Sequence, residues 1–184
     1  MKTTLVRQSR LWSLLCLVLC ATPAWADEQS ELLDRLQIME LQSRYALAHD
    51  LTDPAAYAAV FTADAELVGS GGKVLAKGSE ALRAMTLNDR KRLNGGAPEN
   101  VRQYGAMRHV VTNSIVDITG RDTATGQCYV LSIANNKGHG PEILSIGRYE
   151  DRYRKVNGKW LIAHREIVSD MGNDALAAQV FSTK

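Results

Sequence analysis

The residues best suited to chemistry gather where one long helical pattern ends. Tyr45, His49 and Asp50 place a phenol, an imidazole and a carboxylate in its last turns. Pro54 lacks a backbone N–H and disfavours a helical residue before it, so the helix should end by Asp53. Such a polar group at the end of an apolar helix indicates either a capped terminus, where a cationic His49 suits the helix dipole, or the rim of a pocket.

His109 is the strongest single candidate outside that helix. It lies in an alternating segment, and strand periodicity places it on a mostly apolar face with Met107, Val111, Asn113 and Ile115. An imidazole on an inward-facing strand surface must be hydrogen-bonded or have a function. The alternation leaves both interpretations open: a satisfied core histidine, or a member of a site.

Helix geometry does not by itself bring Tyr45 and Asp50 to one pocket. Five residues on an ideal helix place their side chains roughly 140° apart. The two side chains would face the same pocket only if the helix has already loosened at Asp50.

Other kinds of site lack support in the sequence. The four histidines show no metal-ligand spacing. Cys128 lies in an apolar alternation, which is typical of an inert core thiol. No glycine-rich loop follows a strand and opens a helix, and there is no serine elbow. We therefore expect no metal and no cofactor.

The first 26 residues have the pattern of a secretory signal peptide. Lys2, Arg7 and Arg10 precede an apolar run at residues 11–19, and Ala24-Trp25-Ala26 fits the small-x-small cleavage pattern. Cleavage there would remove these three basic residues from 22 and none of the 20 acidic ones, so the formal net charge falls from +2 to −1. We expect a periplasmic or secreted protein with no stable membrane anchor after cleavage and no nucleic-acid partner.

The helical period is strong at residues 32–50, after a polar stretch at 27–31 that we expect to be loose. The first of its two apolar stripes contains Leu32, Leu36, Met39 and Ala46, and the second contains Ile38, Leu41, Tyr45 and Ala48. Two stripes predict a helix buried on more than one side. A short helix from Pro54, capped by Asp53, and a third helix at 80–93 should follow.

In the second half of the chain, apolar and polar residues alternate. This alternation predicts four long strands, at residues 107–118, 125–134, 143–156 and 159–169. A short strand at 63–68 precedes them, Asn157-Gly158 is a specific hairpin signal, and the loop at 135–141 has no role that the sequence identifies. Helices followed by a meander of strands favour an α+β domain at residues 27–171, with a C-terminal tail at 172–184 that resembles a frayed helix.

Several short motifs, taken together and in order, resemble the SnoaL-like family of the nuclear transport factor 2-like superfamily. They are Tyr45-x4-Asp50 followed by Asp53, the stretches at 57–61 and 64–65, Arg108-His109-Val110-Val111-Thr112-Asn113, Gly147-Arg148-Tyr149-Glu150-Asp151, and residues 158–165. The resemblance covers most of residues 30–170. It implies a cone-shaped, curved antiparallel sheet packed on three N-terminal helices around a pocket.

The sequence is most similar to the branch that contains scytalone dehydratase and bile-acid 7α-dehydratase, which eliminate water without a cofactor. The resemblance implies that His109, oriented by Asp50, removes a proton next to a carbonyl. Tyr45 would then hydrogen-bond the enolate oxygen. Three further residues are expected to contact the substrate: Arg165, Asn113 and Tyr149.

Two functions follow from this resemblance. The first is a cofactor-free lyase (dehydratase) or isomerase acting on a small cyclic hydroxy-ketone. The second is a non-catalytic ligand-binding or accessory module with the same pocket, because fold does not decide function. The presence of Tyr45, Asp50 and His109 favours catalysis, since a binder needs no acid–base pair. Family habit also predicts a homodimer formed through the outer face of the sheet.

Overall fold

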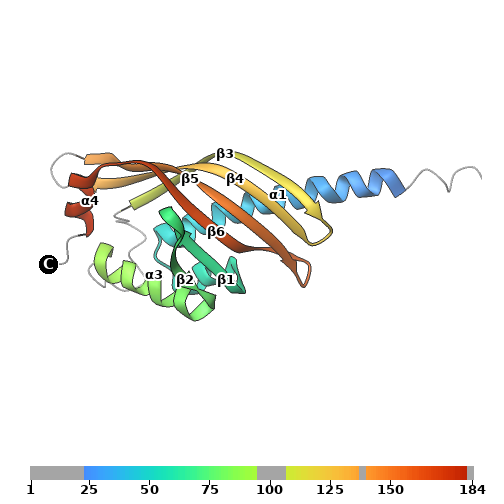
Figure 1. The fold of residues 1–184 in the computed structure, drawn as a ribbon, viewed down its shortest axis with the longest axis horizontal. Helices are drawn as coiled ribbons and strands as arrows, with labels where there is room; N and C mark the ends of the chain where they lie inside the picture. The colour runs from blue at the N-terminus through green and yellow to red at the C-terminus, as the bar shows by residue number, and fades with distance from the viewer. Residues whose placement is uncertain (1–22, 95–106, 137–139, 182–184) are drawn as a thin grey trace, which may run out of the picture. The chain divides into compact units, whose positions relative to one another are not determined.

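The computed structural model describes residues 23–94, 107–136 and 140–181 (Figure 1). In chain order, its elements are α1 (Pro23–Asp50), α2 (Pro54–Ala59), β1 (Phe61–Gly69), the 3₁₀ turn η1 (Ser70–Gly72), β2 (Lys73–Lys77), α3 (Gly78–Asn94), β3 (Met107–Gly120), β4 (Thr123–Asn136), β5 (Gly140–Val156), β6 (Lys159–Gly172) and α4 (Asp174–Phe181). The chain divides into two units, residues 1–33 and 34–184, and the second contains every element except the start of α1.

Helix α1 begins earlier than the sequence predicted. Residues 27–31, which we expected to be loose, are helical and continue into the predicted helix. The expected signal peptide, residues 1–26, lies outside the described residues except for positions 23–26, which belong to α1. None of the helices described is both long and apolar enough to cross a membrane.

Strands β3 to β6 form the antiparallel meander that the sequence predicted, and Figure 1 shows them as long, curved neighbours. The whole sheet has six strands in the order β2-β1-β6-β5-β4-β3. Strand β1 runs parallel to β6 and pairs antiparallel with β2, so the sheet is mixed and open. The sequence did not reveal β2, because only one of its five residues is buried and it has no clear alternation.

Two local predictions about turns and caps are confirmed. The Asp53 side chain accepts hydrogen bonds from the backbone N–H groups of Ala55 and Ala56, each at 3.0 Å, and so caps α2. Asn157 and Gly158 have φ of +51° and +76°, as a tight hairpin between β5 and β6 requires.

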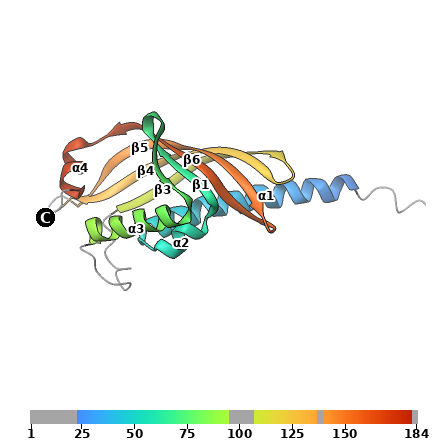
Figure 2. The same cartoon turned by 60° about the horizontal axis from the view of Figure 1, so that its bottom comes forward.

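The two predicted apolar stripes of α1 differ in burial, and the first is buried only at Ala46, near the end of the helix. Ile38, Leu41 and Tyr45 are at most 6% exposed and belong to the main core between the sheet and the helices. In contrast, Leu36 and Met39 are 52% and 44% exposed. The prediction that this helix is buried on more than one side is therefore wrong around Leu36 and Met39, where the sheet lies on one side of the helix (Figure 2), but Tyr45 and Ala46 of the two stripes are both buried near its end.

The C-terminal helix α4 packs against the domain. Its Leu176 is 2% exposed and joins Met107, Ala134 and Leu144 in a second, smaller apolar cluster. The segment at 174–181 is therefore a docked helix that covers the strand ends, and not the frayed helix that the sequence suggested.

Candidate active site

Helix α1 ends as predicted, and its last turns form the wall of a buried site. Thr52 adopts a left-handed φ of +48°, and the N–H of Asp53 donates to the Ala48 carbonyl at 3.0 Å, which closes the helix. Tyr45 and Asp50 are 2% and 8% exposed. Of the two interpretations of this polar group, the structure therefore supports the pocket over the solvated cap.

Asp50 holds His109 through three contacts. The backbone N–H of His109 donates to Asp50 Oδ2 at 3.0 Å and to Oδ1 at 3.2 Å, and Oδ1 lies 2.6 Å from the ring Nδ1. When the carboxylate accepts a hydrogen bond from Nδ1–H, the neutral ring keeps its lone pair on Nε2. A buried imidazole oriented in this way is suited to act as a general base.

This contact explains how Tyr45 and Asp50 can serve one site although they leave α1 in different directions. Asp50 meets His109 on β3, and His109 and Tyr45 both line the same small cavity. Asp50 therefore reaches the cavity through His109 and need not face it directly.

The cavity lies between the end of α1 and strands β3 to β6 and has a volume of about 90 Å³. This exceeds what one water needs but is far below the roughly 300–1,000 Å³ of an ordinary ligand pocket. Ser132, Ser145 and Ser169 add hydroxyl groups to a lining that is otherwise largely apolar. Gly147 is required here, because a Cβ atom at this position would lie 2.2 Å from the Val168 carbonyl oxygen.

Arg165 is fully buried between two tyrosine rings. Its guanidinium carbon lies 4.0 Å from the ring centroid of Tyr45 and 4.1 Å from that of Tyr149. Its Nε and Nη2 donate to the two Asp151 oxygens at 2.8 and 2.6 Å. Burial disfavours its charge, but the Asp151 carboxylate holds the pKa of Arg165 well above its usual range. The guanidinium thus fixes the position of the Tyr45 ring.

The same carboxylate anchors α1 to the sheet. Asp151 Oδ2 accepts a hydrogen bond from the Tyr153 hydroxyl at 2.5 Å, and Gln42 Nε2 donates to that hydroxyl oxygen at 2.9 Å. Gln42 Oε1 accepts in turn from the Ser114 hydroxyl at 2.6 Å. This buried chain of hydrogen bonds fixes the register of α1, and with it Tyr45 and Asp50, over the strands.

Two buried tyrosines beside Tyr45 remain neutral. The Tyr57 hydroxyl donates to the Tyr45 oxygen at 3.3 Å. Burial, reinforced by the neighbouring Tyr45, raises the pKa values of both Tyr57 and Tyr149 well above the usual range. These two phenols therefore stay protonated at neutral pH.

Sequence reasoning missed the part played by His49. Burial and the neighbouring His109 lower the pKa of His49 to about 3, so the ring is neutral and not the cation we considered for the helix dipole. Its ring lies edge-on to that of His109, with centroids 4.7 Å apart, and it lines the same cavity. Its Nε2 is 3.7 Å from Asp89 Oδ2. The four-residue spacing of Tyr45 and His49 was the available signal, because it places both rings on one helix face.

The two histidines and Asp50 also form a potential metal-ligand set that the linear spacing did not indicate. One ligand atom from each of His49, Asp50 and His109 lies within 4.8 Å of the others. Two imidazoles and a carboxylate are ordinary ligands of Zn²⁺. Here, however, Asp50 and His109 Nδ1 already bond to each other at 2.6 Å, and a metal bound through these atoms would have to replace that bond. The geometry therefore fits an acid–base pair better than a metal centre.

Of the remaining predicted site residues, only some line the cavity. Tyr149 lines the cavity, whereas Arg165 lies behind the rings of Tyr45 and Tyr149. Asn113 is exposed, at a bulge where its φ is +55°. The bulge reverses the alternation, so that Ile115 is 54% exposed, and our prediction that Asn113 and Ile115 share the inward face of His109 is wrong. Residues 137–139, the middle of the predicted loop at 135–141, lie outside the described residues.

Comparison with solved structures identifies the fold. A protein of unknown function from Nostoc punctiforme with a cystatin-like fold is 30% identical, with a TM-score of 0.59, over 75% of this chain and 92% of that one. An NTF2-like protein with a cystatin-like fold from Novosphingobium aromaticivorans is 22% identical, with a TM-score of 0.68, over 90% and 99%. A protein proposed to be a scytalone dehydratase from the same organism is 24% identical, with a TM-score of 0.64, over 80% and 91%.

No curated protein sequence matches this chain. The model of the SnoaL-like domain family, in contrast, matches residues 30–166. The match includes α1 from its eighth residue, the sheet up to the middle of β6 and all three residues of the predicted catalytic set. The architecture agrees with the match, since NTF2-like neighbours share the α+β arrangement of a curved sheet packed on helices. The chain belongs to the SnoaL-like domain family.

Proposed function

We propose that this protein is a cofactor-independent lyase or isomerase that acts on a small hydroxy-ketone. The observation that carries the proposal is the 2.6 Å contact between Asp50 and His109 Nδ1, beside a cavity that His109 shares with Tyr45. A base, the group that orients it and an oxygen donor are the three parts that proton abstraction next to a carbonyl requires.

In the proposed reaction, His109 Nε2 takes the proton from the carbon next to the carbonyl. Asp50 accepts a hydrogen bond from Nδ1–H throughout and stabilises the imidazolium that forms. Tyr45 donates a hydrogen bond to the oxygen that becomes an enolate. The protonated His109 then gives its proton either to a leaving hydroxyl, which departs as water, or to another carbon, which gives the isomer.

The surroundings of Tyr45 support its role as donor. Tyr57 already donates to the Tyr45 oxygen, which leaves the Tyr45 proton for another acceptor. The buried Arg165 guanidinium, 4.0 Å from the Tyr45 ring centroid, favours negative charge nearby. A developing enolate at the Tyr45 hydroxyl would therefore find positive potential in a water-poor environment.

The size of the cavity restricts the substrate. At about 90 Å³ it admits a small molecule, or the reacting part of a larger one, and its three serine hydroxyls can hold polar substituents. This supports a compact substrate with hydroxyl and carbonyl groups. The name of the scytalone dehydratase neighbour is consistent with elimination of water, although at 24% identity that likeness concerns the fold alone.

The test is turnover of a panel of small hydroxy-ketones, followed by the absorbance of the conjugated enone that dehydration produces. We expect activity in the native protein and its loss in His109→Ala with the fold retained. His164→Ala is the matched control, because His164 is also a strand histidine but does not line the cavity. Full activity of His109→Ala would refute the mechanism. Saturable binding without turnover would support the alternative, a non-catalytic ligand-binding module.

Export remains part of the proposal. The basic start, the apolar run and the Ala24-Trp25-Ala26 triplet support cleavage of residues 1–26 and delivery to a periplasm or beyond. N-terminal sequencing of the protein recovered from its native compartment should begin at Asp27. An intact Met1 in the cytoplasmic fraction would contradict export.

A further inference from the structure

Helix α1 carries a stripe of exposed apolar side chains along the side away from the core. Within residues 34–51, Leu36, Met39, Leu47 and Leu51 are 52%, 44%, 61% and 40% exposed. The helical repeat of about 100° per residue places these four within one broad face. Single exposed leucines need no explanation, but four exposed apolar side chains on one face, with the exposed Glu40, Ser43 and Arg44 between them, indicate a contact surface.

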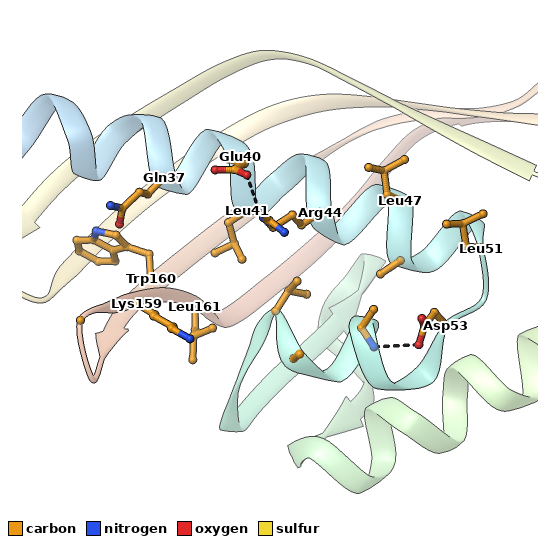
Figure 3. Close-up of a pocket in the computed structure, with 15 residues that line it drawn as sticks. Gln37, Glu40, Leu41, Arg44, Leu47, Leu51, Asp53, Lys159, Trp160 and Leu161 are labelled. Carbon is orange, nitrogen blue, oxygen red and sulfur yellow. Dashed lines mark hydrogen bonds and ion pairs between the residues drawn. The ribbon is translucent and has the colours of Figure 1, made fainter.

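A groove of about 720 Å³ runs beside this stripe (Figure 3). One wall is α1, where Leu47 and Leu51 project, and the other consists of α2 and the start of β6. Ala56 and Ala59 line the α2 wall. Trp160 lies toward one end of the groove (Figure 3). The groove is thus bordered by helix α1 and lined by apolar side chains together with the charged Glu40 and Arg44, a surface on which another helix can pack.

The charges on the stripe are self-complementary. Glu40 and Arg44, 60% and 66% exposed, form an ion pair of 2.6 Å on the same face (Figure 3). They lie at equal distances along the chain on either side of Gln42, and Leu36 and Leu47 lie at nearly equal distances beyond them. Met39 and the small Ser43 occupy the middle of the exposed face. The exposed face therefore carries opposite charges at equal distances from Gln42 and a leucine near each end.

We propose that a second copy of this chain covers the stripe, with the two α1 helices antiparallel and crossing near Ser43. In that arrangement, Leu36 of one copy meets Leu47 of the other at both ends. Glu40 of one copy meets Arg44 of the other on both sides of the two-fold axis. An isologous interface requires a surface that complements itself in this manner. The small side chain of Ser43 permits close approach of the helices at the crossing.

This arrangement differs from the dimer that family habit suggested, which uses the outer face of the sheet. That face also exposes apolar side chains, including Ile115 and Tyr129 at 54% and 55%. The α1 interface is independent of the proposed reaction, because Leu36, Glu40, Arg44 and Leu47 do not line the catalytic cavity.

The first experiment measures the mass of the native protein and two variants by light scattering after gel filtration. Leu47→Glu places a charge on the exposed stripe, and Tyr129→Glu places one on the sheet face, at similar exposure. We expect twice the chain mass for the native protein and for Tyr129→Glu, and the single-chain mass for Leu47→Glu. A native monomer, or a dimer that only Tyr129→Glu dissociates, would overturn the proposal. A monomer that takes up a fatty acid in the groove would also overturn it.

The second experiment tests the antiparallel register. Glu40→Arg gives a stripe with two arginines, and Arg44→Glu gives one with two glutamates, so each variant alone should lose the dimer through repulsion. Mixing the two should restore a dimer that contains one copy of each. Both positions are exposed, so folding should be unaffected, which circular dichroism checks. Failure of the mixture to recover a dimer, with both variants folded, would refute this register.

Discussion

Replacement of Asp50 by asparagine tests the link between structure and chemistry. Asparagine keeps the shape of the side chain, and its amide oxygen can still accept the His109 backbone N–H, which now donates to the carboxylate at 3.0 and 3.2 Å. The amide NH₂, however, would face the ring Nδ1 that now lies 2.6 Å from Oδ1. Two donors cannot face each other, so His109 would move its proton to Nε2 and lose the lone pair that we assign as the base.

The expected cost follows from this change of tautomer. An equivalent substitution in a serine protease triad lowers kcat by about 10⁴-fold, and we expect a loss of about 10³–10⁴-fold here, or about 4–5.5 kcal/mol in the barrier. The free energy of unfolding should fall by only about 1.5–3 kcal/mol, because one charge-assisted hydrogen bond is lost and the others persist.

The assay compares turnover and urea unfolding of Asp50→Asn with those of Asp53→Asn. Asp53 is the matched control, since it caps α2 and asparagine caps a helix equally well. Asp53→Asn should keep both activity and stability. Activity of Asp50→Asn within tenfold of the native protein, with the fold intact, would refute the assignment of His109 as a base oriented by Asp50.

Two further predictions concern buried charge. His49 has a pKa near 3 in the folded state against about 6.5 unfolded, so below pH 6.5 the unfolded state binds the extra proton. The free energy of unfolding should therefore fall by up to about 1.4 kcal/mol per pH unit as the pH drops from 6.5 toward 3. Urea titrations should show a shallower fall in His49→Gln. An equal dependence of the free energy on pH in both proteins would contradict a buried, neutral His49. Arg165→Met would leave the 4%-exposed Asp151 without its partner, and should lower the free energy of unfolding by about 3–5 kcal/mol. Arg148→Met, whose ion pairs lie on the surface, should cost less than about 1 kcal/mol, and similar costs for the two variants would show that the Arg165 pair is not a structural anchor.

The fold could be predicted where the signal is local. Pro54 after Asp53, the Asn157-Gly158 turn and the alternation of the last four strands each act over a few residues, and each element appeared where expected. Strand β2 was not predicted because its five residues pair at a sheet edge and bury only one side chain. The bulge at Asn113 was not predicted because a positive φ at asparagine does not change the pattern of apolar residues in the sequence.

The candidate site shows the opposite limitation. Asp50 and His109 are 59 positions apart, and their contact depends on how β3 packs on α1, which no local pattern encodes. Family resemblance supplied the pairing, whereas the residue types alone left His109 open as a core histidine. The neutral state of His49 is even harder to predict from the sequence, since it arises from desolvation by the surrounding elements together with the nearby His109.

The measurement that tests the central claim most directly is hydrogen exchange at the carbon next to the carbonyl of a small hydroxy-ketone in D₂O, followed by NMR. Proton abstraction there precedes both elimination and isomerisation, so the result does not depend on which product forms. We predict that the native protein catalyses deuterium incorporation and that His109→Ala and Asp50→Asn do not. Incorporation at the native rate in His109→Ala would show that the Asp50–His109 pair is not the base.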